Sequence, residues 1–175
     1  MRGSTLVALA LIAGSLGACG SSAQDAQQQR YCPPGVIVTD AAYLVRFKPG
    51  HGRDPTDVQF QAEIGKVETK CSFSKSGVSV EMRVAIGVVE GPSAQNRTAQ
   101  LSYFVAIIGP GRQVAARKEF PADYQFTGNR NRVFGLEELT QVIPGITDVQ
   151  AQGYQIAVGF VLTQDELTYN RQRRR

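Results

Sequence analysis

The sequence predicts a mainly β protein that folds as a single antiparallel β-sandwich with a short C-terminal helix. Three observations support this prediction. Apolar and polar residues alternate along several segments, turn-forming residues separate these segments, and long helical patterns are absent. Several strands at such spacing are typical of an antiparallel sandwich or barrel, and the absence of helical patterns disfavours a parallel α/β sheet.

The longest alternating segment spans residues 78–89 and predicts a half-buried strand. Its apolar face consists of Val78, Val80, Met82, Val84, Ile86 and Val88. Residues 57–64 and 154–162 alternate in the same way, the latter with Ala157 and Gly159 on the face opposite its large apolar side chains. Residues 101–108 are apolar on both faces, which suits a central strand. We expect these strands to pack as an immunoglobulin-like or fibronectin-III-like sandwich.

Turn residues separate the predicted strands. The turn segments are SKSG at 74–77, GPGR at 109–112 and TGNRN at 127–131. Residues 133–143 are ambiguous, because Leu136, Leu139 and Ile143 fit one face of a helix as well as an extended strand. Pro144 and the surrounding strands favour the extended conformation.

The sequence predicts that a helix begins after the last predicted strand. Thr163 and Glu166 have the T-x-x-E spacing of a capping box, in which each side chain satisfies the other residue's backbone N–H. Asp165 adds a negative charge in the first turn, where the helix dipole favours it. We expect a helix over residues 164–170, packed onto the sandwich through Leu167.

The first 18 residues have the pattern of a secretory signal peptide. Arg2 supplies a positive charge, residues 6–13 are apolar, and small residues follow. The apolar run is shorter than the roughly 20 residues that a membrane-spanning helix needs. The alternative, a buried core helix, is disfavoured by the position at the extreme N-terminus.

The segment Leu16-Gly17-Ala18-Cys19 resembles the lipobox of bacterial lipoproteins. This resemblance implies that a diacylglycerol is attached to the thiol of Cys19, and that the signal peptide is then removed before this residue. Gly20 stands where an Asp retains many such lipoproteins at the inner membrane, so the resemblance implies an outer-membrane anchor facing the periplasm. Polar residues follow Cys19, so we expect residues 19–31 to form a flexible tether and residues 32–170 to form the domain.

The other two cysteines, Cys32 and Cys71, predict a disulfide that closes a loop of 40 residues. Export would place them in an oxidising compartment, where disulfides persist. The alternative is a pair of metal-ligating thiolates, which is disfavoured because no nearby His or C-x-x-C spacing accompanies them.

The formal net charge of +4 is concentrated at the ends of the chain. Without Arg2 the charge is +3, and without the tail residues Arg171, Arg173, Arg174 and Arg175 it is −1. The basic tail over 171–175 is either solvated or in contact with an anionic surface, such as lipid phosphates or cell-wall carboxylates. We expect no nucleic-acid partner, since the tail has no aromatic residues for base stacking.

Segments 32–71, 103–120 and 154–171, which include CPPGVIVTDAAYLVRFKPG, YFVAIIGPGRQVAARKEF and YQIAVGFVLTQDELTYNR, resemble an uncharacterised group of small lipoproteins from Gram-negative bacteria. The similarity covers most of the predicted mature chain. It implies an envelope location and the extent of the domain, and it transfers no activity and no site.

The loop around His51 is the recognition site that the sequence predicts. Besides His51 it contains Arg53, Asp54 and Asp57 among turn-forming Pro and Gly residues, which is typical of a surface loop. His51 and Asp54 together could act as a general base for a serine nucleophile, but the sequence contains no G-x-S-x-G nucleophile segment. Glu137 and Glu138 are adjacent and would face opposite ways on a strand. We therefore expect no catalytic residues, no metal and no cofactor.

These features are compatible with three functions. The favoured one is a non-enzymatic, lipid-anchored β-sandwich that contacts the membrane through its anchor and binds another envelope protein or supports an envelope assembly. The alternative is a carrier of a lipid or other hydrophobic ligand in a β-barrel cavity. A hydrolase of cell-wall material ranks third because only the predicted location suggests it.

Overall fold

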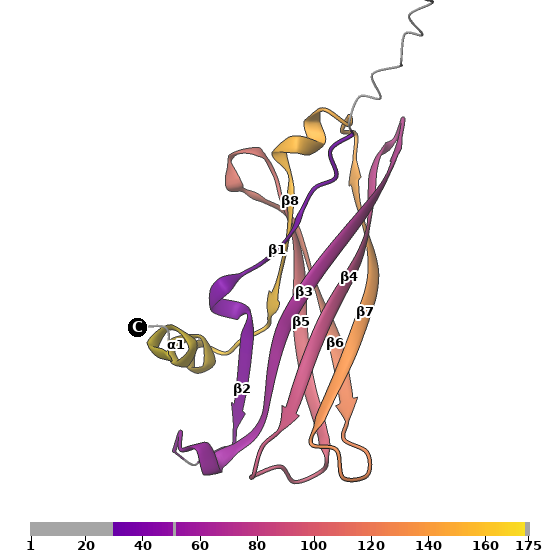
Figure 1. Ribbon diagram of the computed structural model, residues 1–175. Helices are drawn as coiled ribbons and strands as arrows, with labels where there is room; N and C mark the ends of the chain where they lie inside the picture. Colours follow the sequence, from indigo (N-terminus) through magenta and orange to yellow (C-terminus); the bar gives the residue numbers. More distant parts are fainter. Residues whose placement is uncertain (1–29, 51, 174–175) are drawn as a thin grey trace, which may run out of the picture.

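The computed structural model describes residues 30–50 and 52–173, which form two four-stranded sheets packed face to face (Figure 1). The strand orders are β1-β8-β5-β6 and β2-β3-β4-β7. The strands are β1 (Gly35–Ile37), β2 (Tyr43–Phe47), β3 (Val58–Ser74), β4 (Gly77–Glu90), β5 (Thr98–Ile108), β6 (Val114–Gln125), β7 (Arg132–Pro144) and β8 (Gln155–Phe160). Helix α1 (Gln164–Arg173) follows β8. The predicted β-sandwich with a short C-terminal helix is confirmed.

The connections between strands differ from those of an immunoglobulin domain. All neighbouring strands are antiparallel except β1 and β8, which pair in parallel. In the immunoglobulin order the first two strands share a sheet. Here the 3₁₀ turn η1 (Thr39–Ala41) carries the chain from β1 in one sheet to β2 in the other. The sandwich architecture is therefore shared, and the strand order is not.

The alternating pattern of β4 forms the centre of the core, as predicted. Its six inward-facing side chains, at even positions from Val78 to Val88, are each at most 1% exposed. The ambiguous segment 133–143 is extended and lies within β7, which pairs with β4 along its whole length. β5 lies between β8 and β6, so its predicted central position is also confirmed.

β3 is longer than its alternating pattern indicates, because a bulge at Gly65 reverses the pattern. The register between β3 and β4 shifts between Ile64 and Lys66. Even-numbered residues such as Ile64 face the core before the bulge, and odd-numbered residues such as Val67 and Phe73 pack against the core after it. One extra residue in a strand changes the face to which each later side chain points.

β8 is buried on both faces, so the prediction of one exposed face is wrong. Ala157 is 6% exposed although it lies opposite the large apolar side chains. A Cβ atom on Gly159 would come within 2.8 Å of Ala41 Cβ and of the Phe104 ring. The η1 turn and the Phe104 side chain therefore cover the face that the sequence pattern left open.

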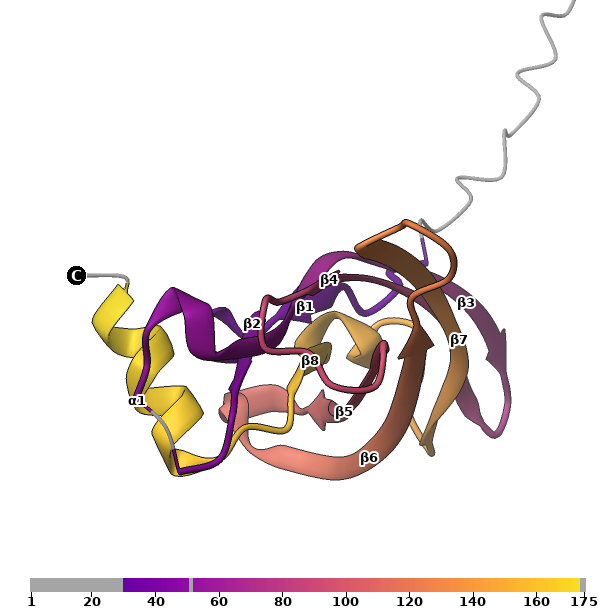
Figure 2. The ribbon, with the colours of Figure 1, turned by 90° about the horizontal axis from the view of Figure 1, so that it is seen from below.

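Helix α1 begins with the predicted capping box and lies beside β2, on the far side of the molecule from β7 (Figure 2). The Thr163 backbone N–H donates to Glu166 Oε2 at 2.8 Å, and the Glu166 N–H donates to Thr163 Oγ1 at 3.2 Å. The helix ends at Arg173, three residues later than predicted.

Asn170 rather than Leu167 makes the specific contacts of α1 with the sandwich. Asn170 is buried, and its Nδ2 donates to the carbonyl oxygens of Asp40 at 2.9 Å and Tyr43 at 2.7 Å. Leu167 is only half-buried. A polar residue thus docks the helix by satisfying backbone acceptors that β2 and η1 leave open.

We expect Asn170→Ala to lower the free energy of unfolding by about 1–3 kcal/mol, because two backbone carbonyls lose their donor. Amide hydrogen exchange in α1 should accelerate at the same time. Urea unfolding and exchange measured by mass spectrometry check both effects. The matched control is Thr168→Ala on the exposed side of α1. If both variants lowered the free energy of unfolding by the same small amount, this role of Asn170 would be contradicted.

Candidate functional site

The predicted recognition loop folds back toward helix α1. The Lys48 N–H donates to the Asp57 carbonyl at 2.9 Å, which closes the loop, and the Asp57 N–H donates to the Asp54 carbonyl at 2.9 Å. Arg53 Nη2 lies 3.8 Å from Asp165 Oδ2. Arg53 is thus directed at the helix, while His51 lies outside the described residues.

Two arginines of the predicted basic tail belong to the last turn of α1. Arg171 Nε lies 2.8 Å from Asp40 Oδ2, and the Arg173 guanidinium lies 5.8 Å from the centroid of the Tyr169 ring. The Arg53 guanidinium approaches the same ring at 5.7 Å. Arg171 and Arg173 therefore contact other residues of the domain and are not simply solvated. Arg174 and Arg175 lie outside the described residues.

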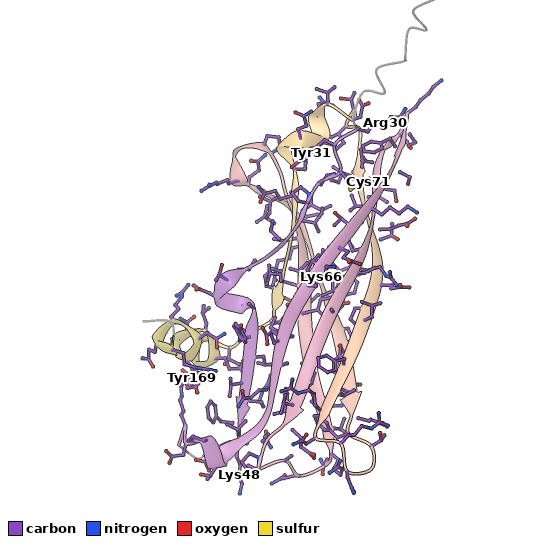
Figure 3. The ribbon with its side chains drawn as sticks, in the orientation of Figure 1. Arg30, Tyr31, Lys48, Lys66, Cys71 and Tyr169 are labelled. Atoms are coloured by element: carbon purple, nitrogen blue, oxygen red, sulfur yellow. A yellow bond between two sulfur atoms is a disulfide. The ribbon has the colours of Figure 1, made fainter. Side chains whose placement is uncertain are left out.

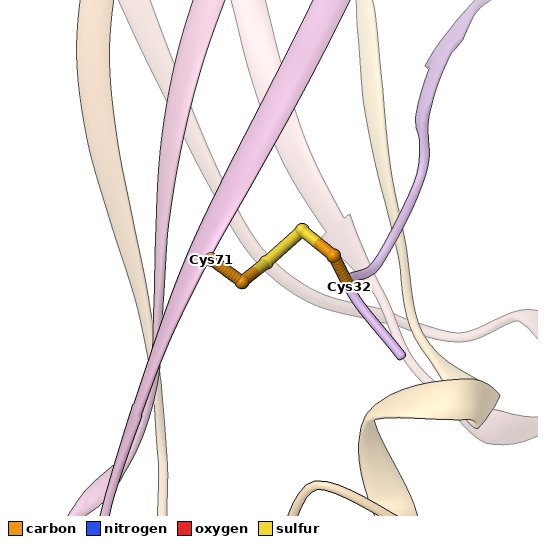
Figure 4. Close-up of a disulfide and its surroundings, with 2 residues drawn as sticks. All are labelled: Cys32 and Cys71. Carbon is orange, nitrogen blue, oxygen red and sulfur yellow. A yellow bond between two sulfur atoms is a disulfide. The ribbon is translucent and has the colours of Figure 1, made fainter. Parts of the chain in front are cut away.

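The predicted disulfide between Cys32 and Cys71 is present, with a Cα–Cα distance of 5.5 Å. It ties the segment before β1 to β3 (Figure 4). Figure 3 shows Cys71 near the end of the molecule that carries Arg30 and Tyr31, with Lys48 at the opposite end. The alternative of metal-ligating thiolates is wrong, because both sulfur atoms are consumed by the bond.

Within residues 30–50 and 52–173, no group of three or more His, Cys, Asp or Glu side chains is placed to hold a metal ion. No helix in the same part of the chain has the length and apolar character needed to cross a membrane. Cys19 and the signal-like segment lie outside the described residues.

The outward-facing side chains of β2, β3, β4 and β7, which we call the outer face, contain a charged trough. The strand register aligns Glu68, Arg83 and Glu138 in one row across three strands, and Lys70, Glu81 and Thr140 in the next row. These six side chains line an open trough of about 940 Å³.

Opposite charges are paired within the trough. Arg83 Nε donates to Glu138 Oε1 at 3.0 Å. A hydrogen bond from Lys66 lowers the pKa of the Glu68 carboxyl below its usual value. The trough therefore presents fixed charges of both signs at positions set by neighbouring strands.

Exposed apolar side chains continue the outer face beside the trough. Phe134 is 72% exposed and Leu136 is 52% exposed. The Phe134 ring lies over Gly87 on β4, where an added Cβ atom would come within 3.1 Å of the ring. The Arg132 guanidinium lies 6.0 Å from the same ring, so a cation flanks the apolar patch.

Neither the trough nor the apolar patch was predictable from the sequence. The alternation of residues 78–89 placed Glu81 and Arg83 on a polar strand face, without indicating which charges lie opposite them. Glu138 is 55 residues from Arg83. Only the register of β3, β4 and β7 brings the rows together.

The adjacent glutamates of β7 point to opposite sides of the sheet, as predicted for a strand. Glu138 lies on the outer face, whereas Glu137 accepts a hydrogen bond from Tyr124 Oη at 2.8 Å. Tyr124 lies against Gly135, and a Cβ atom at that position would come within 2.8 Å of its hydroxyl oxygen. Burial and the Glu137 carboxylate raise the pKa of Tyr103 to about 12, and the same causes raise the pKa of Tyr124.

We expect alkaline pH to destabilise the sandwich through these two phenols. A tyrosine whose pKa is raised in the folded state stabilises that state fully at pH values below about 10, the pKa of the phenol in the unfolded chain. This stabilisation is lost as the pH rises through the pKa of the folded state. For Tyr103 the loss at pH 11 is about 1 kcal/mol. Urea unfolding at pH 8 and 11 measures it, and Tyr103→Phe should show a smaller drop than the parent protein. Equal drops in the two proteins would contradict this assignment.

The outer face combines paired charges, an exposed aromatic ring and an exposed leucine, the combination of side chains found where protein surfaces meet. This arrangement suits recognition of a second surface. No family model, no curated protein and no solved structure matches the chain.

Proposed function

We propose that this chain is a non-catalytic, lipid-anchored module of the Gram-negative envelope that binds another envelope protein through its outer face. The observation that supports this most strongly is the position of exposed Phe134 and Leu136 beside the charged trough. Contiguous exposed apolar side chains on a soluble domain mark interaction sites, and aromatic and Arg side chains contribute much of the binding free energy at interfaces.

The lipobox-like segment ending at Cys19 supports the anchor and the outer-membrane location facing the periplasm. The Cys32–Cys71 disulfide supports export, because such bonds persist in oxidising compartments. Anchoring restricts the domain to the volume next to the membrane. Even a weak binding face is then effective, since tethering raises the local concentration of the two partners.

Core packing favours protein binding over the carrier of a hydrophobic ligand. The Tyr103 and Phe120 rings stack between the sheets with centroids 5.4 Å apart. Phe160 and Met82 are each 1% exposed. Side chains thus fill the described interior in which a carrier would hold its ligand.

Site-specific photo-crosslinking in intact cells tests the proposed function. A photoreactive residue at Lys70 lies in the trough on β3, two strands away from β7. The matched control is Gln100, which is exposed on β5 in the other sheet. We expect a discrete product from Lys70 that contains a second, different polypeptide, and little product from Gln100. Identical products at both positions, or none at Lys70, would contradict the proposal.

A further inference from the structure

The outermost strands of the two sheets are β1 and β6 in one sheet and β2 and β7 in the other. β2 pairs with β3 only from Val58 to Glu63, and the later part of β3 contacts β1 and is tied to the segment before β1 by the Cys32–Cys71 disulfide. An edge strand exposes backbone N–H and C=O groups that pair readily with another strand. Proteins that avoid such pairing protect their edges with short strands, Pro or Lys residues, or a covering segment.

Three of the four edges carry such protection. β1 has only three residues. The edge of β2 is covered by α1, whose Asn170 donates to the Tyr43 carbonyl at 2.7 Å. β6 contains Pro121 together with the adjacent cations Arg117 and Lys118.

β7 is a long strand without Lys, its single Pro stands at its last position, and its charged residues are Arg132, Glu137 and Glu138. Figure 1 shows it at the outer side of its sheet, and no further strand of the described chain pairs beyond it. Its odd-numbered backbone groups are directed at β4: the Asn131 carbonyl accepts from Glu90 N at 2.8 Å, and Gly145 N donates to the Ser76 carbonyl at 2.9 Å. Backbone groups alternate along an antiparallel strand, so the even-numbered groups of β7 point to the open edge.

We propose that β7 pairs with β7 of a second copy of this chain, antiparallel, about a two-fold axis through Gly135. This register places Arg132 opposite Glu138 of the second copy and Phe134 opposite Leu136 of the second copy. The symmetry repeats both contacts. The even-numbered residues that face the open edge are then opposite one another, so their backbone groups form the hydrogen bonds of the new ladder.

Neighbouring registers lose this complementarity. An axis through Leu136 places Phe134 opposite Glu138 and leaves Arg132 opposite Thr140. An axis through Glu138 places two carboxylates directly opposite each other, which destabilises a sheet. Of these three registers, only the axis at Gly135 pairs opposite charges, Arg132 with Glu138, at both ends of the contact.

Pairing in this register joins the two outer faces into one surface of eight strands. It uses the backbone edge of β7 together with Arg132, Phe134, Leu136 and Glu138, which also belong to the outer face. The inference does not rest on the proposed function, because the two predict different products: dimerisation joins two identical chains, whereas crosslinking from Lys70 joins this chain to a different polypeptide.

Charge exchange across the axis tests the pairing. The acylated protein is purified in detergent, and its oligomeric state is measured by native mass spectrometry and analytical ultracentrifugation across micromolar concentrations. Arg132→Glu and Glu138→Arg each place like charges opposite one another twice per dimer. We expect either variant to raise the dimer dissociation constant by about tenfold.

The double variant Arg132→Glu/Glu138→Arg restores opposite charges at both contacts, so it should recover dimerisation. Glu119→Arg, an exposed change on β6, is the matched control and should leave the dimer intact. Circular dichroism checks that each variant is folded. A monomeric parent protein would overturn the inference, as would a dimer that responds equally to Glu119→Arg or that the double variant fails to restore.

Discussion

Replacing Cys32 and Cys71 together by alanine will lower the free energy of unfolding by about 4 kcal/mol in the chain-entropy model. The bond joins residues 39 apart in sequence, so its removal restores a large number of conformations to the unfolded chain. The whole stability of a domain is typically about 5–15 kcal/mol, so the loss is a substantial part of it. Urea unfolding of the oxidised parent protein and the double variant measures the difference.

Two comparisons make this measurement specific. Ser72→Ala, at an exposed neighbour of Cys71 on β3, should change the free energy of unfolding by less than about 0.5 kcal/mol. Reduction of the parent protein should reproduce the loss seen in the double variant. A double variant as stable as the oxidised parent would show that the disulfide does not stabilise the domain.

Cys19→Ala will move the protein from the membrane fraction to the soluble fraction as an unacylated precursor. One acyl chain gives only marginal membrane binding, at about 0.8 kcal/mol per buried methylene, whereas the two chains of a diacylglycerol anchor a protein stably. Fractionation of cells, together with incorporation of a labelled fatty acid, measures the change.

The double variant lacking Cys32 and Cys71 is the control for this change, because it keeps Cys19. It should still incorporate label and remain with the membranes. Equal partitioning of Cys19→Ala and the parent protein into membranes would rule out the anchor.

The strands with regular alternation were predictable because burial on one face imposes a period of two. β4 shows this most clearly, with Val80 and Val84 fully buried. The full length of β3 was not predictable, because the bulge at Gly65 reverses the alternation within one strand. The second buried face of β8 was missed because η1, a segment more than 100 residues earlier, covers it.

The disulfide was predictable from the sequence because Cys19 has a separate assignment and leaves only two cysteines to pair. The outer face was not, since its rows depend on the register between strands that are far apart in the chain. A slip of one residue would move Arg83 out of line with Glu138 and reverse the side to which a strand's residues point. The docking role of Asn170 was hidden for the same reason, since its acceptors lie 127 and 130 residues away.

The most direct test of binding through the outer face is the yield of the Lys70 photo-crosslink in a chain that also carries Arg83→Glu. Arg83 is exposed beside Lys70 in the trough, so the change alters the charge of the face and leaves the core intact. Arg117→Glu on β6 is the matched control. We predict that Arg83→Glu reduces the product to the level of the Gln100 control while Arg117→Glu leaves it unchanged. An undiminished product with Arg83→Glu would contradict the account.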